Sequence, residues 1–140
     1  MTTETRDVFI DTNVLVYATI ASAPLHQQAQ QSLHQLWISR QVLHEYAMVV
    51  TRPQTFMNPL GASGAAAQVD ILMRQFQIAD DTDRVTAEWS RLLQSIPIGG
   101  RQVYDANITA TMLAYGVTHL VTNNGRDFAR YSHLITVIPL

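Results

Sequence analysis

Four acidic residues stand in otherwise apolar stretches of this sequence, where a carboxylate is unexpected. Asp11 follows the apolar run 8–10, Glu45 interrupts "VLHEYAMVV", Asp105 interrupts "VYDANITATML", and Asp127 lies just beyond "HLVT". Any one of them could cap a helix, lie on a solvated helix face or occupy an ordinary turn. Several carboxylates gathered in one place, however, repel one another unless a cation lies among them or their pKa values rise. If the fold brings the four together, they indicate a cation site.

The types of residue in this group limit which cation could bind. The set offers carboxylate oxygens, the chain has no cysteine, and its five histidines are scattered. Ligation by oxygen alone suits Mg²⁺ or Mn²⁺ rather than zinc or copper. The expected cofactor is therefore Mg²⁺ or Mn²⁺.

The elements that would position these residues follow from hydrophobic periodicity, caps and breakers. Short buried strands are expected at residues 7–10, 36–39, 77–79, 119–122 and 134–140. Helices are expected at 12–19, 24–36, 40–52, 63–76, 80–96 and 102–115, and an irregular turn at 123–131. Strands that alternate with helices of this length predict an α/β fold with a parallel sheet and helices on both faces.

In such a sheet, ligands bind just beyond the carboxyl ends of the strands, where the strand order reverses. Residues 11–13 follow the first strand, and residues 122–127 follow the fourth. Asp105 and Glu45 each lie on a helix that could face the same edge of the sheet. The sequence therefore predicts one cleft for all four carboxylates, although spacing alone does not prove that they converge.

Composition bounds the class of protein. The 140 residues, 47 % of them hydrophobic, are most economically one domain spanning 1–140. The absence of cysteine and of any long apolar stretch predicts a cytoplasmic protein. The net charge of −2 gives no general attraction to nucleic acid, so RNA binding would need a local basic patch. The candidate RNA contacts are Arg40, Arg101 and Arg126, which lie near the acidic residues.

Three stretches, taken in order, resemble a known family. They are "FIDTNVLVY", "ISRQVLHEYAMVVTRP" and "QVYDANITATMLAYGVTHLVTNNGRDFARY", which together cover nearly the whole chain. They resemble PIN domains, and among these the VapC-type toxins of bacterial toxin–antitoxin pairs. The resemblance implies a Rossmann-like α/β/α sandwich with a mainly parallel central sheet. It also implies a metal-dependent endoribonuclease, a cognate antitoxin as partner, and a homodimer.

The resemblance also implies roles for individual residues. The family's first three acidic positions fall on Asp11, Glu45 and Asp105. Asp11 and Asp105 are expected to bind the metal directly, whereas Glu45 would act through a water or orient the attacking water. Small polar residues of the family that support the cluster match Thr12, Asn13 and Thr122.

The fourth acidic position has two candidates, because some members place it where Asn124 stands. Members with this longer turn use the Asp of "R-D-F", so we prefer Asp127, with Asn124 as a neutral auxiliary or substrate contact. Asn124 also supports an alternative: a degenerate PIN domain that binds RNA or protein without cutting. A phospho-aspartate phosphohydrolase ranks last, because it would want a second Asp where Asn13 stands.

Overall fold

The computed structural model describes residues 6–19, 35–53 and 59–139. Within these ranges, the strands form a five-stranded sheet in the order β3-β2-β1-β4-β5, and every neighbouring pair is parallel. The strands are β1 (Asp7–Ile10), β2 (Gln35–Ser39), β3 (Gln77–Ala79), β4 (His119–Thr122) and β5 (Thr136–Pro139). The expected α/β class with a parallel sheet is confirmed.

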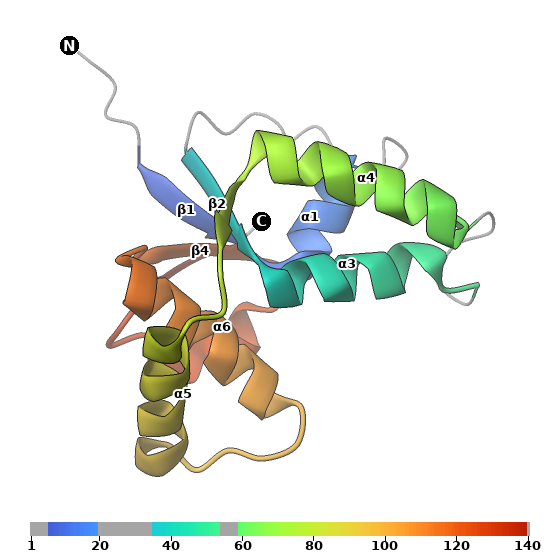
Figure 1. The fold of residues 1–140 in the computed structure, drawn as a ribbon. Coiled ribbons are helices and arrows are strands. Elements are labelled where there is room, and N and C mark those ends of the chain that lie inside the picture. The colour runs from blue at the N-terminus through green and yellow to red at the C-terminus, as the bar shows by residue number, and fades with distance from the viewer. Residues whose placement is uncertain (1–5, 20–34, 54–58, 140) are drawn as a thin grey trace.

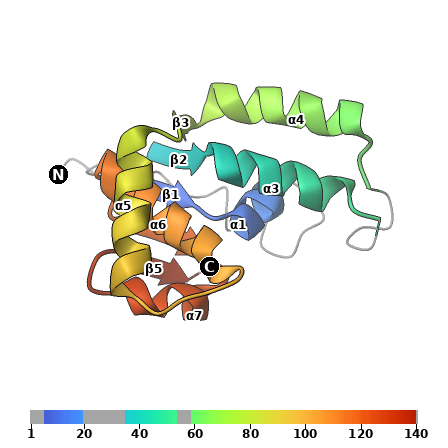
Figure 2. The same cartoon turned by 60° about the horizontal axis from the view of Figure 1, so that its bottom comes forward.

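Helices cover both faces of this sheet. On one face lie α1 (Thr12–Thr19), α3 (Arg40–Thr51) and α4 (Ala62–Gln75), and on the other lie α5 (Asp83–Ser95), α6 (Gln102–Tyr115) and α7 (Gly125–Phe128), as Figures 1 and 2 show. Connections between parallel strands are right-handed, so a helix changes face when the chain reverses its direction across the sheet. That reversal places the switch point between β1 and β4.

The sequence of β1 is apolar because this strand lies in the centre of the sheet. Val8, Phe9 and Ile10 are between 0 and 6 % exposed, because helices lie over both faces and strands pair on both sides. The register pairs Phe9 with Trp37 of β2 and with Leu120 of β4. Asp11, the residue that follows this buried strand, therefore lies at the edge of the core.

Several element boundaries follow from local chemistry that the sequence displays. Ser39 caps α3, because its side chain accepts a hydrogen bond from the Val42 backbone nitrogen at 3.3 Å. Thr82 caps α5 in the same way, so this helix begins at Asp83 rather than at residue 80. Gly116 ends α6 in the left-handed conformation, with φ of 71°, which a residue without a Cβ adopts easily.

The prediction of an irregular turn at 123–131 is wrong. The chain forms α7 and then a 3₁₀ turn, Ala129–Tyr131, in this region. Phe128 and Tyr131 lie three residues apart and are both buried, so one helical turn places both aromatic rings in the core. Most residues around Phe128 and Tyr131 are polar, so the sequence shows no clear helical periodicity in this stretch.

The helix expected at 24–36 lies outside the described residues except at its last two positions. Those two belong to β2, where Gln35 pairs with Asp7 and Leu36 with Val8. Among the described residues, no helix is both long and apolar enough to cross a membrane.

Candidate active site

The carboxyl ends of β1 and β4 meet at the switch point, and Asp11 lies there. Its backbone nitrogen donates to the Val121 carbonyl at 3.1 Å, which continues the ladder between the two strands. Its side chain is only 6 % exposed. One carboxylate oxygen accepts from the Thr12 backbone nitrogen at 2.8 Å, and the other accepts from the Thr122 hydroxyl at 2.7 Å. These two hydrogen bonds hold the Asp11 carboxylate in one orientation at the carboxyl end of β1.

The Thr122 hydroxyl links Asp11 to the loop after β4. It donates to Asp11 and accepts a hydrogen bond from the Asn124 backbone nitrogen at 2.9 Å. Because a hydroxyl has one donor, the bond from Asn124 leaves that donor for Asp11. Thr122 is fully buried, so this contact orders both strand ends.

Helix α3 brings Glu45 to the same place. One of its carboxylate oxygens accepts from the Thr12 hydroxyl at 2.7 Å, and the other accepts from Gln41 Nε2 at 2.8 Å. Gln41 lies one turn earlier on the same helix face. Thr12 therefore bridges Asp11 and Glu45, through its backbone nitrogen and its hydroxyl.

Asp105 reaches the site from the first turn of α6. Its pKa is raised to about 6, first by burial and then by the charges of Asp127, Asp11 and Glu45, while the nearby Arg130 lowers it. Burial likewise raises the pKa of Asp11, although hydrogen bonds from Thr122 and Thr12 act in the other direction. Both pKa values are thus raised in part by electrostatic repulsion from neighbouring carboxylates.

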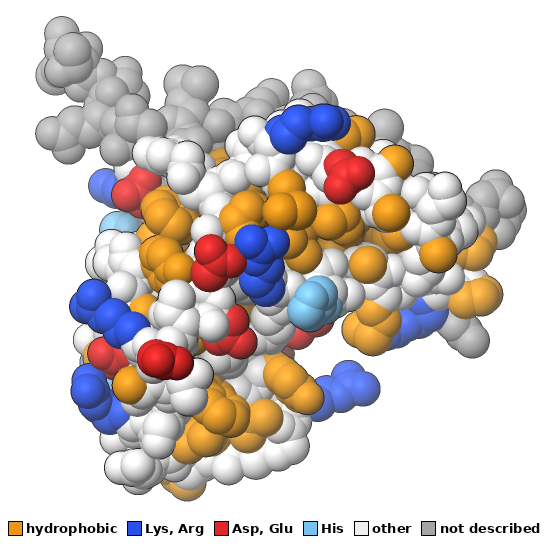
Figure 3. Space-filling model, viewed as in Figure 1, with side chains coloured by type: hydrophobic (Ala, Val, Ile, Leu, Met, Phe, Trp, Pro, Cys, Tyr) orange, Lys and Arg blue, Asp and Glu red, His pale blue; other side chains and the backbone are white. Residues whose placement is uncertain are grey.

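A cleft of about 550 Å³ opens over these groups. Asp11, Glu45 and Asp105 all line it, and Figure 3 shows acidic side chains in the hollow below α3, where α6 begins. The rest of its lining comprises Thr12, Asn13, Gln41, His44, Met48, Val49, Arg52, Arg101, Tyr104 and Asn124.

The family model of the PIN domain matches residues 8–134. This chain belongs to the PIN domain family. A comparison with curated proteins gave no significant match.

Solved structures with the same fold include VapBC2 from Rickettsia felis bound to promoter DNA. It is 22 % identical, with a TM-score of 0.67 over 96 % of this chain and 98 % of that one. A toxin–antitoxin complex from Klebsiella pneumoniae is 20 % identical, with a TM-score of 0.67 over 94 and 95 % of the two chains. VapC20 from Mycobacterium tuberculosis, described as a toxin that cleaves the sarcin-ricin loop, is 21 % identical, with a TM-score of 0.62 over 88 and 94 %. At these identities the likeness concerns the fold.

The fourth acidic position of this PIN domain involves two different residues. Asp127 is exposed on α7 and does not line the cleft, whereas Asn124 does. The charge of Asp127 nevertheless raises the pKa of both Asp11 and Asp105, so its carboxylate acts on the site. Its assignment as a catalytic or metal-binding residue stays a prediction.

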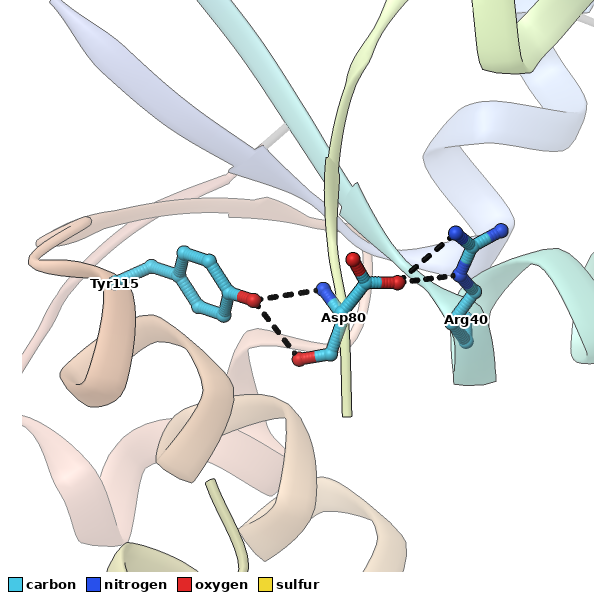
Figure 4. Close-up of polar contacts among 3 residues, drawn as sticks. All are labelled: Arg40, Asp80 and Tyr115. Carbon is cyan, nitrogen blue, oxygen red and sulfur yellow. Dashed lines mark hydrogen bonds and ion pairs between the residues drawn. The ribbon is translucent and has the colours of Figure 1, made fainter. Parts of the chain in front are cut away.

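The three arginines predicted to contact RNA differ in their positions. Arg101 lines the cleft, whereas Arg40 and Arg126 do not. Arg40 directs its Nε and a terminal nitrogen at one carboxylate oxygen of Asp80, both at 2.9 Å, and the Asp80 backbone is held by the Tyr115 hydroxyl (Figure 4). Arg40 is thus paired with Asp80, and its contact with RNA stays a prediction.

The sequence argument missed two features of the PIN cleft. Arg52 lines it, and a signal existed: it lies seven residues after Glu45, two helical turns along the same face. Asn107 of α6 donates to Gln41 Oε1 at 2.9 Å, which ties α6 to α3 beside Glu45. No sequence signal pointed to this second contact, because it joins helices that are distant in the chain.

The donor set fits a hard divalent cation with few protein ligands. Within the part of the chain that the structure describes, no three Asp, Glu or His side chains form a ready-made metal cage. Mg²⁺ usually keeps several waters and binds through one or two carboxylates. Asp11 and Asp105, whose pKa values are raised partly by neighbouring carboxylates, provide that kind of oxygen pair. PIN nucleases in general use divalent metals.

Proposed function

We propose that this PIN domain is a Mg²⁺- or Mn²⁺-dependent endoribonuclease, the toxin of a type II toxin–antitoxin pair. The observation that carries the proposal is the convergence of Asp11, Glu45 and Asp105 on one cleft at the switch point. They come from a strand end and two helices, and the charge of Glu45 raises the pKa of both Asp11 and Asp105. Such a cluster is unfavourable without a cation, so it is more consistent with a functional site than with a stabilising one.

The roles of the residues follow from their contacts. Asp11 and Asp105 would hold the ion, which when bound supplies a water of lowered pKa and neutralises charge on the scissile phosphate. Thr12 and Thr122 keep the Asp11 carboxylate in its orientation. Glu45, held at both oxygens, would accept a hydrogen bond from the attacking water and so direct it. Asp127 would add negative charge from the rim.

The substrate and the partner are inferred from the cleft lining and from solved structures of this fold. Arg52 and Arg101 line the cleft and would contact phosphates of the RNA backbone. A hydrolytic route needs no 2′-hydroxyl as nucleophile, so preference for RNA would come from these groove contacts. Solved structures of this fold include toxin–antitoxin complexes, which supports a cognate antitoxin as partner. Homodimerisation remains a prediction from the family.

Cleavage of a mixed transfer and ribosomal RNA pool tests the proposal. Purified protein is incubated with Mn²⁺ or Mg²⁺, alongside Asp11→Asn and a sample with EDTA. Discrete fragments that vanish in both controls support a metal nuclease, and the fragment ends identify the target. Cleavage that survives Asp11→Asn contradicts the site assignment.

A second candidate is a PIN domain that binds RNA or protein without cutting it. One observation favours it: Asn124 rather than Asp127 lines the cleft. The same experiment separates the two functions when metal binding is also measured. Absence of both cleavage and Mn²⁺ binding supports the binding module.

A further inference from the structure

Two amide side chains from different helices meet beside Glu45. Gln41 belongs to α3 and Asn107 to α6, and both are half-buried. Asn107 Nδ2 donates to Gln41 Oε1 at 2.9 Å, and Gln41 Nε2 donates to a Glu45 oxygen at 2.8 Å. A continuous chain of hydrogen bonds therefore runs from α6 to the Glu45 carboxylate.

The acceptors around Gln41 fix the direction of its amide. Gln41 Nε2 also lies 3.3 Å from the Tyr104 carbonyl oxygen. An ionised carboxylate and a backbone carbonyl only accept hydrogen bonds, so the group that faces both is the NH₂ of Gln41. Its oxygen then faces Asn107, which presents its own NH₂. Only this orientation satisfies all three contacts.

We propose that Gln41 is a positioning residue for Glu45 and that Asn107 sets the direction of the Gln41 amide. The proposal rests on the nuclease function proposed above. The Thr12 hydroxyl holds the second Glu45 oxygen at 2.7 Å, so the carboxylate is fixed from both sides. Partners that orient the groups of a metal site are typically worth 10–100-fold in metal affinity or activity.

The first test is Gln41→Leu, which keeps much of the side chain's volume but removes the donor. We expect kcat for RNA cleavage to fall about 10–100-fold and KM to change by less than about threefold, because the arginines that would contact phosphates are unchanged. Melting temperatures of all variants are measured in parallel. A wild-type kcat in Gln41→Leu overturns the proposal.

The sharper test compares two changes at Asn107. Asn107→Asp fits the same space but only accepts, so its carboxylate competes with Glu45 for the Gln41 NH₂ and favours the inverted amide. Asn107→Ala leaves the Gln41 NH₂ free to stay on Glu45. We expect the aspartate to lower kcat at least tenfold more than the alanine does. A packing role gives the reverse order, because alanine leaves a cavity.

The added charge of Asn107→Asp needs its own control. In a Gln41→Leu background the aspartate has no amide to invert, so we expect it to change kcat by less than about twofold. A further large loss in that background means that charge is responsible, which overturns the proposal.

Calorimetric titration with Mn²⁺ alone provides a readout without RNA. Because the water that Glu45 would hold is bound to the ion, we expect Asn107→Asp to bind Mn²⁺ at least tenfold more weakly than Asn107→Ala, although added negative charge by itself would strengthen binding. If this order holds while wild type cuts no RNA, the nuclease function fails and the positioning role stands. If wild type cuts RNA and the order is absent, only the positioning role fails. Wild type that neither cuts RNA nor binds Mn²⁺ overturns both.

Discussion

Replacing Asp105 by Asn should stabilise the metal-free protein at neutral pH while it abolishes cleavage. The pKa of Asp105 is raised from 3.8 to about 6 in the folded chain, first by burial and then by Asp127, Asp11 and Glu45. Between these two pH values the folded protein binds more protons than the unfolded chain does, so the free energy of unfolding falls as pH rises. Above about pH 6 the whole penalty of the ionised carboxylate is present, and Asn does not carry it.

The magnitude follows from the shift and its surroundings. A shift of about 2 units corresponds to about 3 kcal/mol, because each unit is worth about 1.4 kcal/mol. Asp105 is only half-buried, so solvent screening reduces this to about 1.5 kcal/mol. A carboxylate in the first turn of α6 also gains about 0.5 kcal/mol from the helix dipole, which Asn loses. The net gain is about 1 kcal/mol, or about 3 °C in melting temperature.

Thermal unfolding in EDTA at pH 7.5 and at pH 4 measures this gain. The exposed Asp70 of α4, replaced by Asn, is the matched control and should change little at either pH. The gain of Asp105→Asn should be present at pH 7.5 and nearly absent at pH 4, where the wild-type carboxyl is largely protonated. A variant that is destabilised at pH 7.5, or stabilised equally at both values, refutes the reasoning.

Four other outcomes are expected. In thermal unfolding, Mn²⁺ at 100 times its Kd should stabilise wild type by about 2.7 kcal/mol and leave the stability of Asp11→Asn unchanged. Equal stabilisation of both proteins would mean that the ion binds elsewhere. Asp127→Asn should lower the pKa of Asp105, because the charge of Asp127 raises this pKa more than any other charge does. Carboxyl ¹³C NMR titration measures the pKa, and an unchanged value would show that Asp127 does not act on the site. Tyr104 is 60 % exposed in the cleft lining, so Tyr104→Ala should weaken binding of single-stranded RNA to a cleavage-dead variant by about 1–3 kcal/mol, and Tyr104→Phe should not. Arg101→Ala should raise KM for RNA and flatten its salt dependence, and an unaltered salt slope would argue against a phosphate contact.

The fold could be predicted from sequence because its signals are local. The apolar run of β1, the Ser39 cap and the Gly116 stop each act within a few residues. The turn that became α7 could not, since its helical form depends on burying Phe128 and Tyr131 against elements elsewhere in the chain.

For the site, the sequence predicted that Asp11, Glu45 and Asp105 would share a cleft, but not how their side chains are held. Asp11, Glu45 and Asp105 line one cleft, as the strand-end rule led us to expect, although their chemical roles remain predictions. The capture of Arg40 by Asp80 and the link from Asn107 to Gln41 join residues 40 and 66 positions apart. Contacts of this kind depend on how helices pack, which periodicity does not specify.

The hydrogen bond between Thr122 and Asp11 joins residues 111 positions apart, and this has a consequence for biosynthesis. A ribosome adding about 5–20 residues per second needs about 6–20 s to pass from one partner to the other. During that interval β1 has no β4 to pair with, and Asp11 lacks the hydroxyl that orients it. A nascent chain therefore carries an unfinished centre until β4 has emerged. A truncated product that ends before β4 would retain Asp11, Glu45 and Asp105, yet lack the strand that aligns them.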